Sequence, residues 1–303
     1  MKNMIRKLAC IVSCVLILYA CKSGNSDYSS QLGIDDSTGT GEVEVSQAAM
    51  SQVVDNVSSP VEMAALIKAI GVPFSQKYMA TTDNSDNYNT SFSKAFNLGV
   101  FGADLGYLNM YNKTSSVVEY ITVIKKLAEG INVGQFFDFN TLKRLATNNE
   151  NIDSLKYISV HSFNVMDKYL QKNKRSNLSA LMVAGVWVEG IYLATQVYKD
   201  KPNKKLAEHI GEQKLMLSEL LIILNNYQKD KYIADLITDL NTIKTEFDQV
   251  TITIIKGEPE QVIENDVLTI KQNEKSIVNI SDEQLKKLIS VTEQVRDKLV
   301  KIQ

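Results

Sequence analysis

Scarcity of proline is the feature that most constrains the fold of this 303-residue chain. Only four prolines occur, at positions 60, 73, 202 and 259, so none lies between 73 and 202. Proline removes a backbone donor and breaks a helix interior, and a chain with so few prolines can form long helices. Hydrophobic residues make up 44% of the sequence, which is enough for a hydrophobic core.

Apolar residues recur at helical spacing along most of the chain after residue 59. Ser59-Pro60-Val61-Glu62 combines a serine N-cap, a proline at the first helical position and a glutamate at the third. Ser281 to Gln284 forms a capping box that opens the last helix. Between them, the spacing predicts helices over residues 91–112, 115–130, 141–147, 151–172, 176–199 (with Ser176 as the cap), 202–224 and 230–250.

The region from Thr251 to Ile280 has a different pattern. Residues 251–254, 267–270 and 276–280 alternate or are β-branched, which predicts short strands. An irregular loop packed against the bundle fits the same residues. The sequence therefore predicts one all-α domain, a bundle or array of nine or ten helices, with a short β-hairpin-like insertion near 251–280.

One predicted helix, which reads FNLGVFGADLGYLNMYN from Phe96 to Asn112, carries an unusual stripe of glycine. Gly99, Gly102 and Gly106 fall at spacings of three and four, so they share one face. Glycine costs a helix about 1 kcal/mol relative to alanine. Three on one face predict that a neighbouring helix packs unusually close.

The helix over residues 178–198, LSALMVAGVWVEGIYLATQVY, is apolar nearly all round. We interpret it as a central buried helix, because Glu189 lies at its middle and a charge at the bilayer centre costs roughly 2.5–3.5 kcal/mol. It also resembles the glycine-rich helix. Gly99-Val100-Phe101 parallels Gly185-Val186-Trp187, and an acid with a tyrosine three residues on follows each triplet. One residue must be dropped to align them, so the repeat is weak.

These acids, Asp104 and Glu189, with Tyr107 and Tyr192, are the candidate functional residues. An unpaired buried acid costs several kcal/mol, so each needs a partner. In the favoured interpretation they are structural, accepting hydrogen bonds from Tyr107, Tyr192 or a helix terminus. In the alternative, the paired carboxylates line a pocket that binds a cationic or polyhydroxylated ligand.

Several kinds of chemistry are not indicated by the sequence. Lys and Arg number 33 against 35 Asp and Glu, which disfavours nucleic acid as a partner. There are two histidines, and His161 is predicted on the buried side of its helix. No zinc, di-iron, nucleophile-elbow or phosphate-loop motif occurs. Residues 83–89 echo a calcium loop but have Tyr88 and Lys94 at its glycine and glutamate positions, so no metal or cofactor is expected.

The N-terminus has the pattern of an export signal. Basic residues in positions 1–7 precede an apolar run from Leu8 to Ala20, which is shorter than the about 20 residues that span a bilayer. Leu18-Tyr19-Ala20-Cys21 resembles the bacterial lipobox, although Tyr19 stands where a small residue is usual. All three cysteines lie at or before this point, so Cys21 would be the only one left after cleavage. We therefore predict a signal peptide over 1–20, a flexible tether over 21–42 and a single helical domain over 43–303.

With this lipobox, the segment from Gly99 to Tyr111 and the Asn151–Ser154 motif, the chain resembles uncharacterised helical lipoproteins of Bacteroidetes. The resemblance implies a cell-envelope protein whose partner is the membrane, anchored through lipid on Cys21, at the outer membrane. It implies no activity. The favoured function is non-enzymatic binding of a protein or small molecule, or a scaffold role. The alternative is a carboxylate-dependent hydrolase of glycan or cell-wall material, which needs carboxyls about 5–10 Å apart beside a cleft.

Overall fold

The computed structural model describes residues 60–147, 152–257, 260–264, 267–271 and 274–301. The predicted signal peptide (1–20), the tether (21–42) and Cys21 lie outside the described residues. Within them are nine α-helices and four strands, which confirms the predicted all-α fold with a small β insertion. The helices are α3 (Pro60–Ala69), α4 (Ser91–Met110), α5 (Thr114–Gly130), α6 (Phe139–Thr147), α7 (Ile152–Lys172), α8 (Ser176–Asp200), α9 (Lys204–Asn225), α10 (Lys231–Phe247) and α11 (Asp282–Val300).

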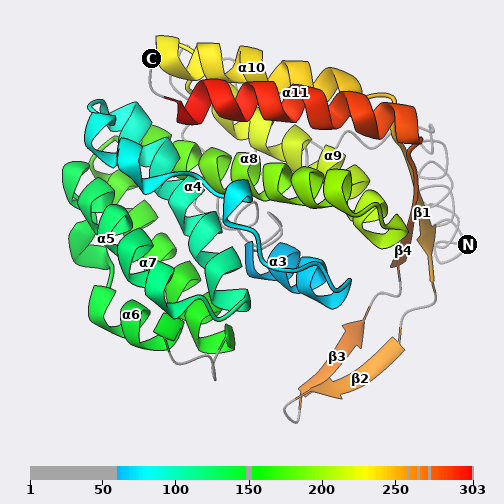
Figure 1. Cartoon of the computed structure of the whole chain (residues 1–303), viewed down its shortest axis with the longest axis horizontal. Coiled ribbons are helices and arrows are strands. Elements are labelled where there is room, and N and C mark those ends of the chain that lie inside the picture. The colour runs from blue at the N-terminus through cyan, green and yellow to red at the C-terminus, as the bar shows by residue number, and fades with distance from the viewer. Residues whose placement is uncertain (1–59, 148–151, 258–259, 265–266, 272–273, 302–303) are drawn as a thin grey trace, which may run out of the picture. The chain divides into compact units, whose positions relative to one another are not determined.

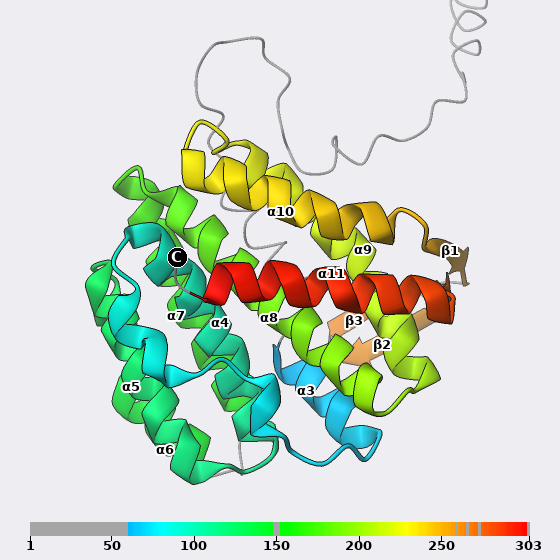
Figure 2. The same cartoon turned by 45° about the horizontal axis from the view of Figure 1, so that its top comes forward.

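Helix α8 lies at the centre of the bundle. It packs against α4, α9 and α11, and more narrowly against α3 and α7. Both views show α11 running across α8, with α10 beside α11 (Figures 1 and 2). Helix α8 is long and apolar enough to cross a membrane, but most of it is buried inside the protein. This burial agrees with its interpretation as a core helix.

Of the predicted caps, Ser281 is confirmed, Ser176 is not, and Ser59 lies outside the described residues. Asn203 caps α9 by accepting a hydrogen bond from the backbone N–H of Leu206, and Asp230 caps α10 in the same way. The prediction that Ser176 caps α8 is wrong. Ser176 is the first helical residue and Arg175 holds the cap position without a side-chain hydrogen bond, so α8 depends on packing at this end.

Helix α11 begins with the predicted capping box. The Ser281 hydroxyl accepts from the Gln284 backbone N–H at 3.2 Å, and the Gln284 side chain accepts from the Ser281 N–H at 2.7 Å. The Gln284 amide nitrogen also donates to the carbonyl of Gln249, just after α10. The box therefore fixes both the start of α11 and its position beside α10.

We expect Ser281→Ala to lower the free energy of unfolding by about 1 kcal/mol, the usual effect of losing a serine N-cap. Denaturant unfolding followed by circular dichroism measures the change. Ser290→Ala is the matched control, because Ser290 is exposed within α11 and caps nothing. An equal effect of the two substitutions would show that the capping box does not stabilise α11.

The residues between α10 and α11 form strands rather than an irregular loop. Strand β1 (Thr251–Lys256) pairs antiparallel with β4 (Glu274–Asn279), so that Thr251 faces Asn279. Strand β2 (Glu260–Glu264) pairs antiparallel with β3 (Val267–Lys271). The four strands form two nested two-stranded ribbons, and β4 contacts α9.

The structure corrects the predicted position of His161. This side chain is exposed, and its ring stacks on that of Tyr157, which is 70% exposed, at a centroid distance of 6.0 Å. The buried face of α7 instead carries Ser162, Met166 and Leu170. These residues are spaced four apart, so they share the face of α7 that packs on the core, and His161 lies outside that face.

Candidate functional site

The two helices that carry the candidate acids cross in direct backbone contact. A Cβ atom at Gly99 of α4 would lie 2.0 Å from the carbonyl oxygen of Met182, and one at Gly185 of α8 would lie 2.0 Å from the carbonyl oxygen of Phe96. Each carbonyl belongs to the residue three positions before the other glycine, so the contact is reciprocal. Only glycine permits helices to approach this closely.

This crossing gives the weak sequence repeat a structural explanation. The equivalent triplets that begin at Gly99 and Gly185 lie against each other, in an arrangement close to local two-fold symmetry. Asp104 follows its glycine by five residues and Glu189 follows its own by four. The predicted close packing is confirmed at Gly99 but not at Gly102, where a Cβ would meet nothing within 4 Å.

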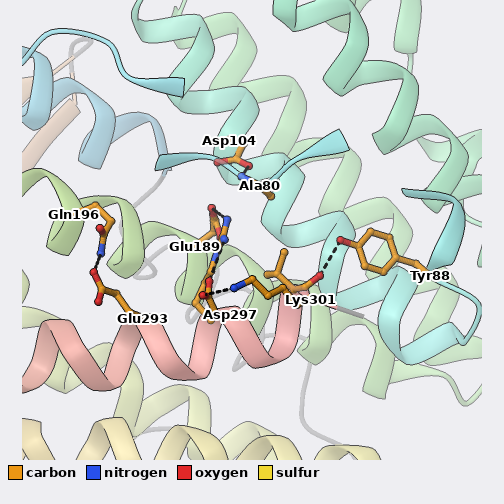
Figure 3. A network of polar contacts seen from close by, with 10 residues as sticks. Ala80, Tyr88, Asp104, Glu189, Gln196, Glu293, Asp297 and Lys301 are labelled. Carbon is orange, nitrogen blue, oxygen red and sulfur yellow. Dashed lines mark hydrogen bonds and ion pairs between the residues drawn. The ribbon is translucent and has the colours of Figure 1, made fainter. Parts of the chain in front are cut away.

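Beyond the crossing, the two acids meet in the interior. Asp104 and Glu189 are both fully buried, and the negative charge of Glu189 acts on Asp104. Figure 3 shows them facing each other between α4 and α8, with α11 alongside. Neither carboxyl is in contact with solvent.

Glu189 is bound by an arginine that the sequence analysis did not single out. Arg296 of α11 donates two hydrogen bonds to it, from Nε to Oε2 at 2.9 Å and from Nη2 to Oε1 at 2.8 Å. The guanidinium also lies 4.3 Å from the centre of the Tyr192 ring, a cation–π distance. Arg296 is only 7% exposed, so this bidentate pair is shielded from water.

Asp104 is connected to a different part of the chain. Its Oδ2 accepts a hydrogen bond of 2.9 Å from the backbone N–H of Ala80, in the segment before α4. The carbonyl of Ala80 in turn accepts a hydrogen bond of 2.5 Å from the hydroxyl of Tyr120, in α5. The polar cluster formed by Ala80, Asp104, Tyr120, Glu189 and Arg296, which we call the buried acid cluster, therefore links α4, α5, α8 and α11.

The electrostatics of the cluster follow from its burial. Desolvation raises the pKa of Asp104 well above its usual range, and the negative charge of Glu189 adds to the effect. The Ala80 N–H and Arg296 oppose this shift but do not cancel it. Burial alone would lower the pKa of Arg296, but the Glu189 carboxylate raises it above its usual value, so Arg296 stays charged.

Of the four predicted site residues, the structure brings Asp104, Glu189 and Tyr192 together. Their partners differ from those expected. Tyr192 contacts the acid cluster through its ring rather than its hydroxyl. The Tyr107 hydroxyl accepts a hydrogen bond from the backbone N–H of Ser75 at 3.1 Å, and its ring stacks on Phe74. The prediction that these tyrosines donate to the acids is wrong, because Ala80 and Arg296 occupy that role. Ligand binding by the four residues stays a prediction.

The region that echoes a calcium loop also uses its acids within the protein. Residues 82–87 form a 3₁₀ helix (η3, Thr82–Asn87). Asp83 accepts a hydrogen bond from the Thr81 hydroxyl, and Asp86 pairs with Lys126 of α5. Among the residues that the structure describes, no group of three or more His, Cys, Asp or Glu side chains is placed to hold a metal ion.

The chain matches no protein-family model, no curated protein and no solved structure.

Proposed function

We propose that this chain is an envelope lipoprotein, held at the membrane by lipid on Cys21, and that its helical body is a non-enzymatic binding or scaffold protein. The anchor rests on the sequence Leu18-Tyr19-Ala20-Cys21 and the export signal before it. More than one acyl chain on this cysteine would give a stable attachment, since a single chain binds membranes only marginally. The resemblance to helical lipoproteins of Bacteroidetes supports an outer-membrane location.

The non-enzymatic proposal rests on one observation, the complete burial of both acids. A glycosidase needs two carboxyls on either side of a bond that the substrate brings into a cleft. Asp104 and Glu189 are fully buried, and Glu189 has both oxygens bound to Arg296. This geometry favours a structural role over the alternative of a carboxylate-dependent hydrolase.

A scaffold role also fits what the acid cluster connects. Ala80 lies before α4, whereas Arg296 lies in the last helix, and both bind acids at the centre of the bundle. The carboxyls thus hold distant parts of the chain in one arrangement. A rigid body of this kind, on a lipid anchor and a polar tether, would hold a partner near the membrane.

Mass spectrometry of the N-terminal peptide of the protein purified from membranes tests the anchor. We expect cleavage before Cys21 and a lipid mass on this residue, both abolished by Cys21→Ala. Cys14→Ala is the matched control and should leave the modification unchanged, because Cys14 lies within the predicted signal peptide. An unmodified N-terminus in the native protein would overturn the anchor.

A further inference from the structure

The buried acid cluster contains more acid than base. Asp104 and Glu189 each carry a carboxyl group, and Arg296 is the one cation that acts on Asp104 among the described residues. Two ionised carboxylates are both acceptors and cannot hydrogen-bond to each other. Both acids are fully buried and face each other, with one guanidinium beside them, so we expect one of the two carboxyls to hold a proton.

The hydrogen bonds indicate which acid holds that proton. Both oxygens of Glu189 receive N–H donors from Arg296, the geometry that suits an ionised carboxylate. On Asp104, Oδ2 accepts from the Ala80 N–H, but Oδ1 is buried and receives no donor from the described residues. An oxygen without a donor, beside a carboxylate, is the expected place for an acidic proton.

The other titratable groups around Asp104 do not supply a compensating charge. Tyr120 of α5 and Tyr88, which precedes α4, both interact with it, as does Tyr107 of its own helix. Burial raises the pKa of Tyr88 to about 12 and also raises those of Tyr107 and Tyr120. These hydroxyls are therefore neutral near pH 7, and the balance rests on Asp104, Glu189 and Arg296.

We propose that Asp104 is a neutral carboxylic acid that donates its proton from Oδ1 to Glu189, and that this proton keeps the contact between α4, α8 and α11 sealed. Ionisation of Asp104 would leave two carboxylates against one guanidinium, with neither carboxylate exposed to solvent. The site would then have to admit solvent, because a net charge is not stable in such a place. The cluster therefore makes the packing of α4, α8 and α11 sensitive to pH.

The direction of the pH effect follows from linkage. The pKa of Asp104 is raised in the folded protein, so between the unfolded pKa of about 3.9 and the folded pKa the native state holds one proton more than the unfolded state. The contribution of Asp104 to the free energy of unfolding has its full value below the unfolded pKa. It decreases as the pH rises, and is lost once the pH passes the folded pKa.

The test compares the full-length protein in detergent with Asp104→Asn over a range of pH. Asparagine keeps the shape of the protonated acid, since its oxygen can accept from Ala80 and its NH₂ can donate to Glu189. We expect the unfolding equilibrium constant of the wild type to rise, relative to the variant, by up to about tenfold per pH unit from about pH 4 upward. Asp138→Asn is the matched control. Asp138 is exposed, and hydrogen bonds from Thr141 lower its pKa. The substitution Asp138→Asn should therefore change the pH dependence of stability only at acidic pH.

A direct measurement on the wild type keeps the proposal testable if Asp104→Asn does not fold. With [4-¹³C]aspartate labelling, infrared spectroscopy separates the carbonyl stretch of a protonated aspartic acid from lipid ester bands. We expect this band in the folded protein at neutral pH and its loss at alkaline pH. Parallel stability profiles for wild type and Asp104→Asn, or no protonated aspartate band at neutral pH, would each overturn the proposal.

Discussion

Arg296→Met is expected to lower the free energy of unfolding by about 3–5 kcal/mol, because it leaves the Glu189 carboxylate buried without its charge partner. Methionine fills much of the arginine volume, so the loss reports the charge and hydrogen bonds more than a cavity. Chemical denaturation at neutral pH, followed by circular dichroism, measures the difference.

Two further variants test whether the loss of stability comes from the unpaired buried charge. Lys298→Met is the matched control in the same helix: Lys298 pairs with Asp239 at 2.6 Å but is 50% exposed, and such pairs contribute about 0–1 kcal/mol. The double substitution Glu189→Met with Arg296→Met should recover most of the loss, since no unpaired buried charge remains. Equal effects of Arg296→Met and Lys298→Met would contradict a structural role for the buried pair.

The acids of this site could be predicted from sequence, but their main partner could not. Asp104 and Glu189 stand out because each is a charge within an apolar helix. Arg296 is 107 residues from Glu189 and lies in a helix rich in charge, where one more arginine suggests a solvated surface. A signal was nevertheless present: Leu285, Ile289 and Thr292 set a core spacing that continues four residues on, at Arg296.

The fold was predictable to the extent that local signals determine it. The capping box at Ser281 follows from hydrogen bonds within a few residues, and the structure confirms it. Other features depend on which helices become neighbours. The pattern placed His161 toward the core, but packing against the rest of the bundle leaves it exposed and buries its neighbour Ser162 instead. In the region 251–280, strand propensity was visible, whereas the nested pairing of β1 with β4 depends on distant residues.

The acid cluster and the glycine crossing are two parts of one arrangement. The close contact at Gly99 and Gly185 sets the distance between α4 and α8, and the acids about one turn further on face each other because of it. If the helices were held further apart, Asp104 and Glu189 could not share a proton. The crossing is therefore the second place where a small change should have a large effect.

Gly185→Ala is expected to lower the free energy of unfolding by about 3 kcal/mol, at the upper end of the usual range for an overpacked core. The new methyl group would lie 2.0 Å from the carbonyl oxygen of Phe96, and because this atom belongs to the backbone, a whole helix must move to accommodate it.

Gly190→Ala in the same helix is the matched control, because a Cβ there meets nothing within 4 Å. Alanine should stabilise that position by about 0.5–1 kcal/mol through its higher helix propensity. The two substitutions are chemically identical and five residues apart, so opposite signs would attribute the loss to the crossing itself. Gly99→Ala should reproduce the loss and Gly102→Ala the gain, since the contact at Gly99 is reciprocal and Gly102 faces open space. Stabilisation by Gly185→Ala would mean that α4 and α8 are further apart than this contact requires, and the basis for a shared proton would be lost with it.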